Sequence, residues 1–336
     1  MIKTAVVILN WNGRQHLEQF LPSVVEHTPA SAQIIVADNG STDDSVAFLR
    51  EHYPSIDIIS LPQNYGFAEG YNRALEQVDS DYFVLLNSDV EVTAGWLEPL
   101  VATLTNDSSV AAVAPKLRSY GYRDQFEYAG ASGGFIDFLG YPFCRGRILS
   151  TVEQDRGQYD SPREVFWASG AAFCCRADLF RILGGFDADF FAHMEEIDLC
   201  WRMQLAGYRI VVEPRSVVYH LGGGTLPNES PQKLYLNYRN NLAMLFKCTP
   251  TSQRLVVAVA RPVCDMLSVL LYAVQGKWPL AKATLRAYRD FIDAHRDLNK
   301  KRKATRSARK AESKMIYRGS IVLRYALGKK RFENML

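Results

Sequence analysis

The N-terminal part of the chain alternates between short apolar runs and apolar residues at helical spacing. Ala5 to Leu9 is a continuous apolar run of strand length, and comparable runs follow at 33–37, 56–60 and 82–86. Between the last two runs, apolar side chains within 68–78 recur with the period of a helix. This order predicts an α/β domain with a mostly parallel, doubly wound sheet.

The pattern changes in the second half of the chain. Residues 115–165 are rich in Gly, Tyr and Phe without clean periodicity, so we expect loops and short strands there that border the acceptor of a reaction. From Leu255 onward the pattern predicts helices only. Between these regions we expect helices and strands in the order helix 179–183, helix 197–206, strand 209–212, strand 217–219 and helix 234–246.

The charges are distributed unevenly. The 336 residues include 39 Lys and Arg against 36 Asp and Glu, for a net charge of +3. The region 296–331 is dense in Lys and Arg, which suits an anionic surface such as lipid headgroups but also a solvated end. The most apolar stretch, Leu255 to Val274, is interrupted by Arg261, Pro262 and Asp265, short of the ~20 apolar residues that cross a bilayer.

The cysteines and the N-terminus point to a reducing compartment. No signal peptide opens the chain, and the six cysteines form no CxxC pair or zinc spacing. The adjacent Cys174 and Cys175 should face opposite sides of one element. We expect a cytoplasmic protein without a nucleic-acid partner. Its tail, 250–336, either contacts the inner face of the cytoplasmic membrane or packs on the catalytic domain.

Two of the predicted strands end at an aspartate. Asp38 follows the second strand, and Asp89 follows the fourth in the sequence Asn87-Ser88-Asp89. Ligands of doubly wound sheets bind at the carboxyl ends of strands. A carboxylate at a strand end can hold a hard divalent cation whose other ligands are water and diphosphate oxygens. A turn-capping role is the alternative for Asp89.

Further candidates lie beyond residue 190. Glu195, Glu196 and Asp198 crowd the start of a predicted helix, where mutual repulsion raises the pKa of a carboxyl and favours a general base. Helix capping could account for two of them, and Asp198 is our candidate for a structural role. His220 follows a short strand, where it could bind metal or be purely structural.

The loop 64–72 enters a predicted helix whose N-terminus could face phosphate or ribose. Other well-known sites are absent from the sequence: it has no Gly-x-Gly-x-x-Gly after a strand, no phosphate-binding Gly-Lys-Ser/Thr loop, no His-Glu-x-x-His and no serine nucleophile elbow. Dehydrogenases, P-loop kinases, zinc proteases and serine hydrolases are therefore disfavoured.

Taken in order, these segments resemble family 2 glycosyltransferases of the GT-A fold, over about residues 3 to 247. Within that family the chain is most similar to the rhamnosyltransferase branch of cell-surface polysaccharide assembly. The segments that carry the resemblance are Val6-Val7-Ile8-Leu9-Asn10-Trp11-Asn12-Gly13, Val36-Ala37-Asp38-Asn39-Gly40-Ser41-Thr42-Asp43, Asn64-Tyr65-Gly66-Phe67-Ala68-Glu69-Gly70-Tyr71-Asn72, Leu85-Leu86-Asn87-Ser88-Asp89, Gly184-Gly185-Phe186-Asp187, Glu195-Glu196-Ile197-Asp198-Leu199-Cys200-Trp201-Arg202 and His220.

The resemblance implies roles for these residues. Asp38 would accept from a pyrimidine N3–H, supported by Asn10 and Asn39, and Asp89 and His220 would bind Mg²⁺ or Mn²⁺. Glu196 would be the catalytic base, with Glu195 beside it as the other choice. The ribose and diphosphate side would be lined by Asn64, Gly66 and Asn72, and the family's Asp-x-Asp position is occupied by Asn87, Ser88 and Asp89.

The expected reaction is transfer of one sugar, with inversion, from a UDP- or dTDP-sugar to a hydroxyl of a saccharide or lipid-linked saccharide. The expected organisation is a nucleotide-binding half at 1–115, an acceptor and catalytic half at 116–248, and a helical, basic extension at 249–336. A nucleotidyltransferase that makes NDP-sugars and a non-catalytic nucleotide-binding subunit are the two alternatives.

Overall fold

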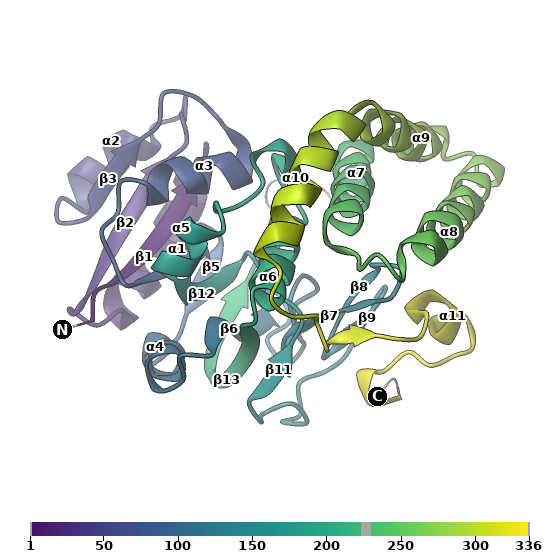
Figure 1. The fold of residues 1–336 in the computed structure, drawn as a ribbon. Helices are drawn as coiled ribbons and strands as arrows, with labels where there is room; N and C mark the ends of the chain where they lie inside the picture. The colour runs from purple at the N-terminus through teal and green to yellow at the C-terminus, as the bar shows by residue number, and fades with distance from the viewer. Residues whose placement is uncertain (1, 223–229, 335–336) are drawn as a thin grey trace.

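The computed structural model describes residues 2–222 and 230–334, and a nine-stranded sheet runs through it (Figure 1). Its first half is parallel, in the order β4-β1-β2-β3. These strands are β1 (Thr4–Asn10), β2 (Ala32–Asp38), β3 (Asp57–Ser60) and β4 (Tyr82–Asn87). The register sets Asn10 beside Asp38 and Leu9 beside Asn87, so three strand ends meet at one edge of the sheet.

The second half of this sheet is mixed. β12 (Ala172–Arg176) runs antiparallel to β4 and to β6 (Val110–Ser119), and β13 (Arg209–His220) runs parallel to β6. Both β11 (Arg163–Val165) and β5 (Val90–Val92) are antiparallel to β13. The α/β prediction is confirmed: β1–β4 form one parallel block, β6 and β13 form a second parallel pair, and the antiparallel strand β12 joins the two. The two strands expected at 209–212 and 217–219 are one strand with a bulge.

A smaller, five-stranded sheet has the order β10-β9-β8-β7-β14. Its strands are β7 (Gly134–Asp137), β8 (Pro142–Cys144), β9 (Arg147–Ile148), β10 (Thr151–Val152) and β14 (Ile316–Tyr317). β14 comes from the C-terminal extension and pairs in parallel with β7. The expectation of helices only after Leu255 is therefore wrong, because a two-residue strand is too short to show a periodicity.

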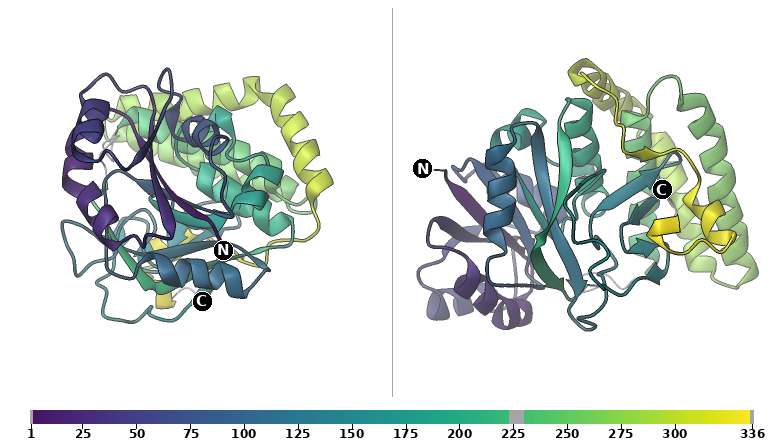
Figure 2. Two further views of the ribbon diagram at one scale, coloured as in Figure 1. Left: turned by 90° about the vertical axis from the view of Figure 1, so that its left-hand side faces the viewer. Right: turned by 90° about the horizontal axis from the view of Figure 1, so that it is seen from below.

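Helices cover both faces of the central sheet (Figures 1 and 2). Two hydrophobic clusters lie on these faces: one contains Val6 of β1 and Leu17 of α1, the other Val7 of β1 and Tyr71 of α3. The helices are α1 (Arg14–His27), α2 (Ser45–His52), α3 (Gly66–Leu75), α4 (Leu97–Asn106), α5 (Ala177–Ile182), α6 (Glu195–Leu205), α7 (Pro231–Cys248), α8 (Arg254–Val274), α9 (Trp278–Asp293), α10 (His295–Ala308) and α11 (Ile321–Ala326), with 3₁₀ turns η1 (Ala188–Phe190) and η2 (Phe332–Asn334).

Two sequence predictions concern the cysteines and the longest helix. Cys174 and Cys175 belong to different hydrophobic clusters, which confirms that they face opposite sides of β12. Leu255 to Val274, expected to be too interrupted to cross a membrane, forms the continuous helix α8. Within the described residues α8 is one helix that is long and apolar enough to span a bilayer, by length and composition only.

Candidate active site

The carboxyl ends of β1 and β2 hold two of the side chains assigned to the nucleotide pocket. Asn10 Nδ2 donates to Asp38 Oδ1 at 3.1 Å, and the Ser41 backbone amide donates to Asp38 Oδ2 at 3.0 Å. Both Asn10 and Asp38 are buried. Because a carboxylate offers about four lone-pair sites, Asp38 can still accept a hydrogen bond from a base.

The loop that enters α3 is held by its own hydrogen bonds. Asn64 Oδ1 accepts from the Gly66 amide at 2.8 Å, and Asn39 Nδ2 donates to Asn64 Oδ1 at 3.2 Å and to the Gly66 carbonyl at 2.9 Å. The next two amides of α3 both donate to the Phe191 carbonyl, at 2.6 and 3.1 Å. The helix N-terminus that the sequence offered to phosphate is therefore already satisfied. The nucleotide contacts of Asn39, Asn64 and Gly66 stay predictions.

Asp89 and His220 lie together at the pairing of β5 with β13. His220 Nε2 is 3.2 Å from Asp89 Oδ1, and its Nδ1 is 3.3 Å from Glu127 Oε1. All three side chains are buried. Burial alone would lower the pKa of His220, but Asp89 and Glu127 raise it to about 10. Burial would raise the pKa of Asp89, but attraction to His220 holds it below its ordinary value.

This pair of side chains suits a shared divalent cation. A carboxylate oxygen and an imidazole nitrogen are ligands that Mn²⁺ accepts in proteins, and a carboxylate also suits Mg²⁺. In residues 2–222 and 230–334, no group of three or more His, Cys, Asp and Glu side chains could hold a metal ion alone. A cation at Asp89 and His220 would therefore need oxygens from a diphosphate or water. Asn87 in the first acid position lowers the negative charge there.

The acid cluster at the start of α6 divides into different environments. Asp198 is fully buried and pairs with Arg202 and Lys247, both at 2.8 Å, which fits the structural role expected for it. Glu195 is buried, whereas Glu196 is partly exposed. Burial raises the pKa of Glu196 to about 7, although nearby backbone amides lower it. Burial and the charge of Glu196 raise the pKa of Glu195 well above its ordinary value.

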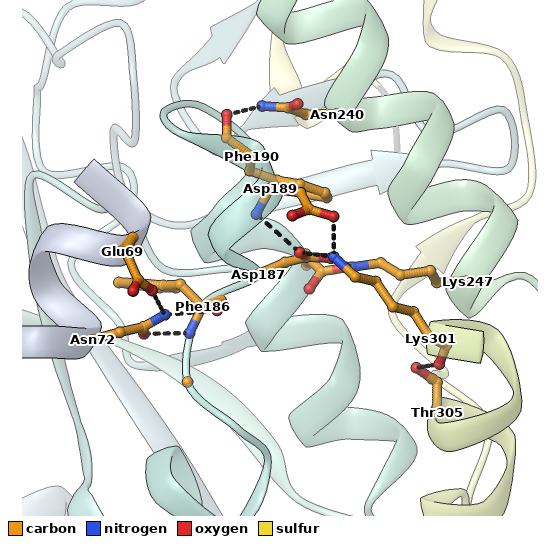
Figure 3. Close-up of polar contacts among 12 residues, drawn as sticks. Glu69, Asn72, Phe186, Asp187, Asp189, Phe190, Asn240, Lys247, Lys301 and Thr305 are labelled. Atoms are coloured by element: carbon orange, nitrogen blue, oxygen red, sulfur yellow. Dashed lines mark hydrogen bonds and ion pairs between the residues drawn. The ribbon is translucent and has the colours of Figure 1, made fainter. Parts of the chain in front are cut away.

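The segment before these acids, the 186–194 loop, is clamped by α7 (Figure 3). Asn240 Nδ2 lies within 2.7 to 2.9 Å of three loop carbonyls, those of Phe190, Ala192 and His193. Positive φ angles, which strain a side chain that is not glycine, occur at three loop residues. They are Phe191, His193 and Met194.

The first part of the same loop is held from two other directions (Figure 3). Asp187 accepts from Lys247 of α7 and Lys301 of α10. Asn72 of α3 donates to the Phe186 carbonyl and accepts from the Phe186 amide, each at 2.9 Å. The sequence places Asn72 on the ribose and diphosphate side, but the structure uses its amide to hold the loop. A cavity of about 700 Å³ adjoins this network, and two of the cations that line it, Lys247 and Lys301, pair with Asp187.

Comparison with known proteins identifies this arrangement. Residues 5–162 match the sequence model described as glycosyl transferase family 2. Residues 5–162 are therefore a family 2 glycosyltransferase domain. The match covers β1 to β4 and the residues of their carboxyl ends, from Asn10 to Asp89.

Relatives and solved structures agree with this assignment. The glycosyltransferase is 28% identical over 233 residues to the N-acetylglucosaminyl-diphospho-decaprenol L-rhamnosyltransferase of Mycobacterium tuberculosis, covering 64% of this chain and 75% of the relative. Its fold is similar to that of S. aureus TarS with UDP-GlcNAc, with a TM-score of 0.59, 15% identity and 93% coverage of each chain. It is also similar to GalNAc-T7 with UDP, GalNAc and Mn²⁺, with a TM-score of 0.58, 17% identity, and coverage of 74% of this chain and 48% of that one. These structures show a GT-A fold.

The fold of the glycosyltransferase brings the predicted groups toward one another. The Asn87 backbone amide donates to the Ala171 carbonyl. The adjacent Gly170 backbone amide lowers the pKa of the Glu196 carboxyl. Gly170 also lies beside the Glu196 side chain, since a Cβ on Gly170 would be 3.9 Å from the Glu196 Cβ. The roles of these residues in catalysis stay predictions.

Two residues that contact the candidate site, Glu127 and Asn240, were not predicted from the sequence. Glu127 lies in the aperiodic region 115–165, where no periodicity singles out an inward-facing acid. Asn240 lies in the middle of a helical pattern, which indicates only a polar side chain on a helix. In both cases the sequence shows only a polar residue among apolar neighbours, and this pattern does not identify the residue that its side chain contacts.

Proposed function

We propose that this glycosyltransferase transfers a single sugar, with inversion, from a UDP- or dTDP-sugar to a hydroxyl of a lipid-linked saccharide in cell-surface polysaccharide assembly. The observation that carries the proposal is the contact between Asp89 and His220 at the sheet edge that also holds Asp38. A nucleotide held by Asp38 would have its diphosphate near that pair. Glu196 would then accept the proton of the acceptor hydroxyl.

The chain's own residues divide the work as follows. Asp38 orients the pyrimidine by accepting from N3–H, and Asn10 fixes the Asp38 carboxylate. Glu196 accepts the proton of the acceptor hydroxyl while that oxygen bonds to the anomeric carbon. The bond between this carbon and the diphosphate oxygen breaks, and the nucleoside diphosphate leaves with the electron pair. A single displacement from the opposite face inverts the anomeric centre.

Asp89 and His220 would hold Mg²⁺ or Mn²⁺. The cation would supply charge stabilisation to the departing diphosphate. The GalNAc-T7 structure contains UDP together with Mn²⁺, which supports this assignment by fold analogy alone.

The acceptor class follows from the mycobacterial relative. That protein's name specifies an N-acetylglucosaminyl diphosphate on decaprenol and an L-rhamnosyl donor. We infer a polyprenol-linked saccharide diphosphate as acceptor and an activated L-rhamnose as the first donor to test. Such an acceptor would place the enzyme at the cytoplasmic face of a membrane. The rhamnosyltransferase relative favours sugar transfer over the nucleotidyltransferase alternative.

A donor screen tests the proposal. Purified protein is mixed with UDP- or dTDP-sugars, with GlcNAc diphosphate on a short polyprenol and with Mn²⁺, and released nucleoside diphosphate is measured. We expect release that requires both donor and acceptor and stops with EDTA, and a product whose anomeric configuration is opposite to that of the donor by NMR. Transfer that is unaffected by EDTA would exclude the metal, and retention of configuration would exclude the single displacement.

A further inference from the structure

The helix α8 has its polar side turned inward and its apolar side turned outward. Arg261 and Asp265, its only charged residues after Arg254, are 4% and 0% exposed. In contrast, Leu255, Leu267 and Val274 are 77%, 62% and 78% exposed. The outward side, which we call the α8 face, consists of Leu255, Val256, Val259, Val263, Met266, Leu267, Leu270, Leu271 and Val274.

This inverted orientation is fixed by buried polar contacts. Arg261 Nε donates to both oxygens of Asp265, at 2.9 and 2.8 Å. Tyr141 and Tyr288 each donate a hydroxyl hydrogen bond of 2.7 Å to Asp265. Arg261 also donates to the Leu139 carbonyl at 2.9 Å. Rotating α8 to hide its leucines would expose these contacts and leave buried partners unpaired, so the apolar face is held outward.

The surroundings of the α8 face indicate what covers it. Residues 249–336 contain 20 Lys and Arg against six Asp and Glu. Exposed Arg254 and Lys277 border the two ends of α8, and exposed Lys282 follows on α9. A contiguous exposed apolar patch marks an interaction site, and basic residues beside apolar ones suit anionic headgroups above acyl chains. Two copies joined through this face would bring two strongly basic segments together, which electrostatic repulsion opposes.

A second apolar patch occurs at the same end of the molecule. Leu323 of α11 and Leu327, which follows its last residue, are 61% and 71% exposed, and Lys329 and Lys330 come next. Both α8 and α11 attach to the turn region of β7–β8: α8 through Tyr141, and α11 through the Ile321 amide, which donates to Asp137. Figure 1 shows both helices at the end opposite the N-terminal strands.

We propose that the α8 face is a docking surface for the headgroup and outer acyl region of an anionic bilayer, with α8 lying in the membrane surface. Spanning the bilayer would require Arg261 and Asp265 to leave their buried partners. A short chain of contacts leads to the site around His220: β8 runs from beside Tyr141 to Cys144, whose thiol accepts from Arg147, and Arg147 also donates to the Tyr128 carbonyl next to Glu127. Docking would therefore place the catalytic carboxylates near a lipid-linked acceptor. This consequence rests on the proposed function, whereas binding to lipid does not.

The test measures binding of the full chain to vesicles of phosphatidylcholine with and without phosphatidylglycerol. We expect binding to the anionic vesicles that weakens in high salt. The double variant L267E/L270E should bind about tenfold more weakly or worse, because two leucines no longer enter the apolar layer. The matched control is Ile182→Glu, an exposed aliphatic residue of α5 (76% exposed), which should bind like the parent chain.

A second measurement tests how the surface lies. Trp278, the first residue of α9, is 58% exposed a few residues after α8 ends. Its fluorescence should be quenched by lipids brominated on their acyl chains, and Trp278→Phe should lose this quenching. Unchanged vesicle binding of L267E/L270E, with circular dichroism showing a folded protein, would overturn the proposal. So would self-association that the double variant abolishes in a parent protein that does not bind vesicles. Neither outcome depends on whether sugar transfer is observed.

Discussion

At the scale of single residues, the environment separates side chains that look equivalent in the sequence. Glu195, Glu196 and Asp198 lie within four positions, yet their environments differ. Asp198 is buried in an ion network, Glu195 is buried with no ion pair among residues 2–222 and 230–334, and Glu196 is partly exposed. A base must reach its substrate and titrate near the working pH. Glu196 meets both conditions, so burial favours it over its neighbour.

Replacing Glu196 tests this assignment. Glu196→Gln should lower kcat by about 10²–10⁴-fold because the amide cannot accept the acceptor's proton. Steady-state kinetics of sugar transfer measure the effect, with donor affinity from UDP titration as the control. Glu195→Gln should lose less activity. A larger loss in Glu195→Gln than in Glu196→Gln would assign the base to Glu195.

The pH dependence of the parent enzyme follows from the same carboxyl. Burial raises the pKa of Glu196 to about 7, so below this pH the folded enzyme holds the protonated, inactive form. We expect kcat to fall with decreasing pH below about 7 and to level off above it. A rate that stays constant down to the ordinary pKa of a glutamate would contradict the assignment.

Glu127 is expected to orient His220. Its carboxylate, 3.3 Å from Nδ1, accepts the Nδ1 proton, so a metal would displace the proton of Nε2, the nitrogen that faces Asp89. Glu127→Gln should weaken Mn²⁺ binding in the presence of UDP by about 10–100-fold, measured by electron paramagnetic resonance. Glu91→Gln, at a surface ion pair with Arg123, is the control and should bind Mn²⁺ normally. Equal affinities in the two variants would exclude the orienting role.

At the scale of elements, the 186–194 loop links three helices to the start of α6. Phe191 caps α3 through its carbonyl, Asn240 of α7 holds the middle of the loop, and Lys301 of α10 holds its beginning. Positive φ angles at non-glycine residues persist only where the surroundings impose them. The position of Glu196 therefore depends on contacts made by side chains far away in the sequence.

Removing the clamp should affect turnover more than donor binding. Asn240→Ala deletes the donor that serves three carbonyls, so we expect lower kcat, a nearly unchanged KM for the donor, and about 1–3 kcal/mol less stability. Kinetics and denaturant unfolding measure the two effects. Asn299→Ala, at an exposed position of α10, is the matched control. A parallel loss of kcat and donor affinity would indicate general damage to the fold instead.

At the scale of the whole molecule, the C-terminal extension contributes to the main core. Leu298, Ile321 and Phe332 are buried in the same hydrophobic cluster as Val7 of β1. The Phe332 ring lies 5.1 Å from that of Phe135, centroid to centroid, and β14 extends the smaller sheet. The basic extension therefore packs on the rest of the chain, and its outward face is what remains for a membrane. Removing it after Thr249 would uncover apolar surface.

The core contribution of the extension can be measured with two nearby substitutions. Phe332→Ala should lower the free energy of unfolding by about 3–5 kcal/mol because it leaves a cavity among aromatic rings. Leu327→Ala, at a side chain that is 71% exposed, should change it by less than about 0.5 kcal/mol. Thermal unfolding checks both. Similar melting temperatures for the two variants would show that the Phe332 packing is not stabilising.

The sequence by itself determined the elements and positions that depend on local pattern. Apolar runs such as Ala5 to Leu9 and Tyr82 to Leu86, separated by segments of helical periodicity, predicted the parallel strands. Because parallel strands end at one edge of the sheet, their last positions identified Asp38 and Asp89 as candidates. Only the tertiary structure decided what depends on contacts across long separations. Glu127 contacts His220, and Asn72 and Asn240 hydrogen-bond to the 186–194 loop. β14 pairs with the smaller sheet, and the leucines of α8 face outward. Periodicity shows that a helix has two faces, but burial of Arg261 and Asp265 by partners elsewhere in the chain decides which face meets the solvent.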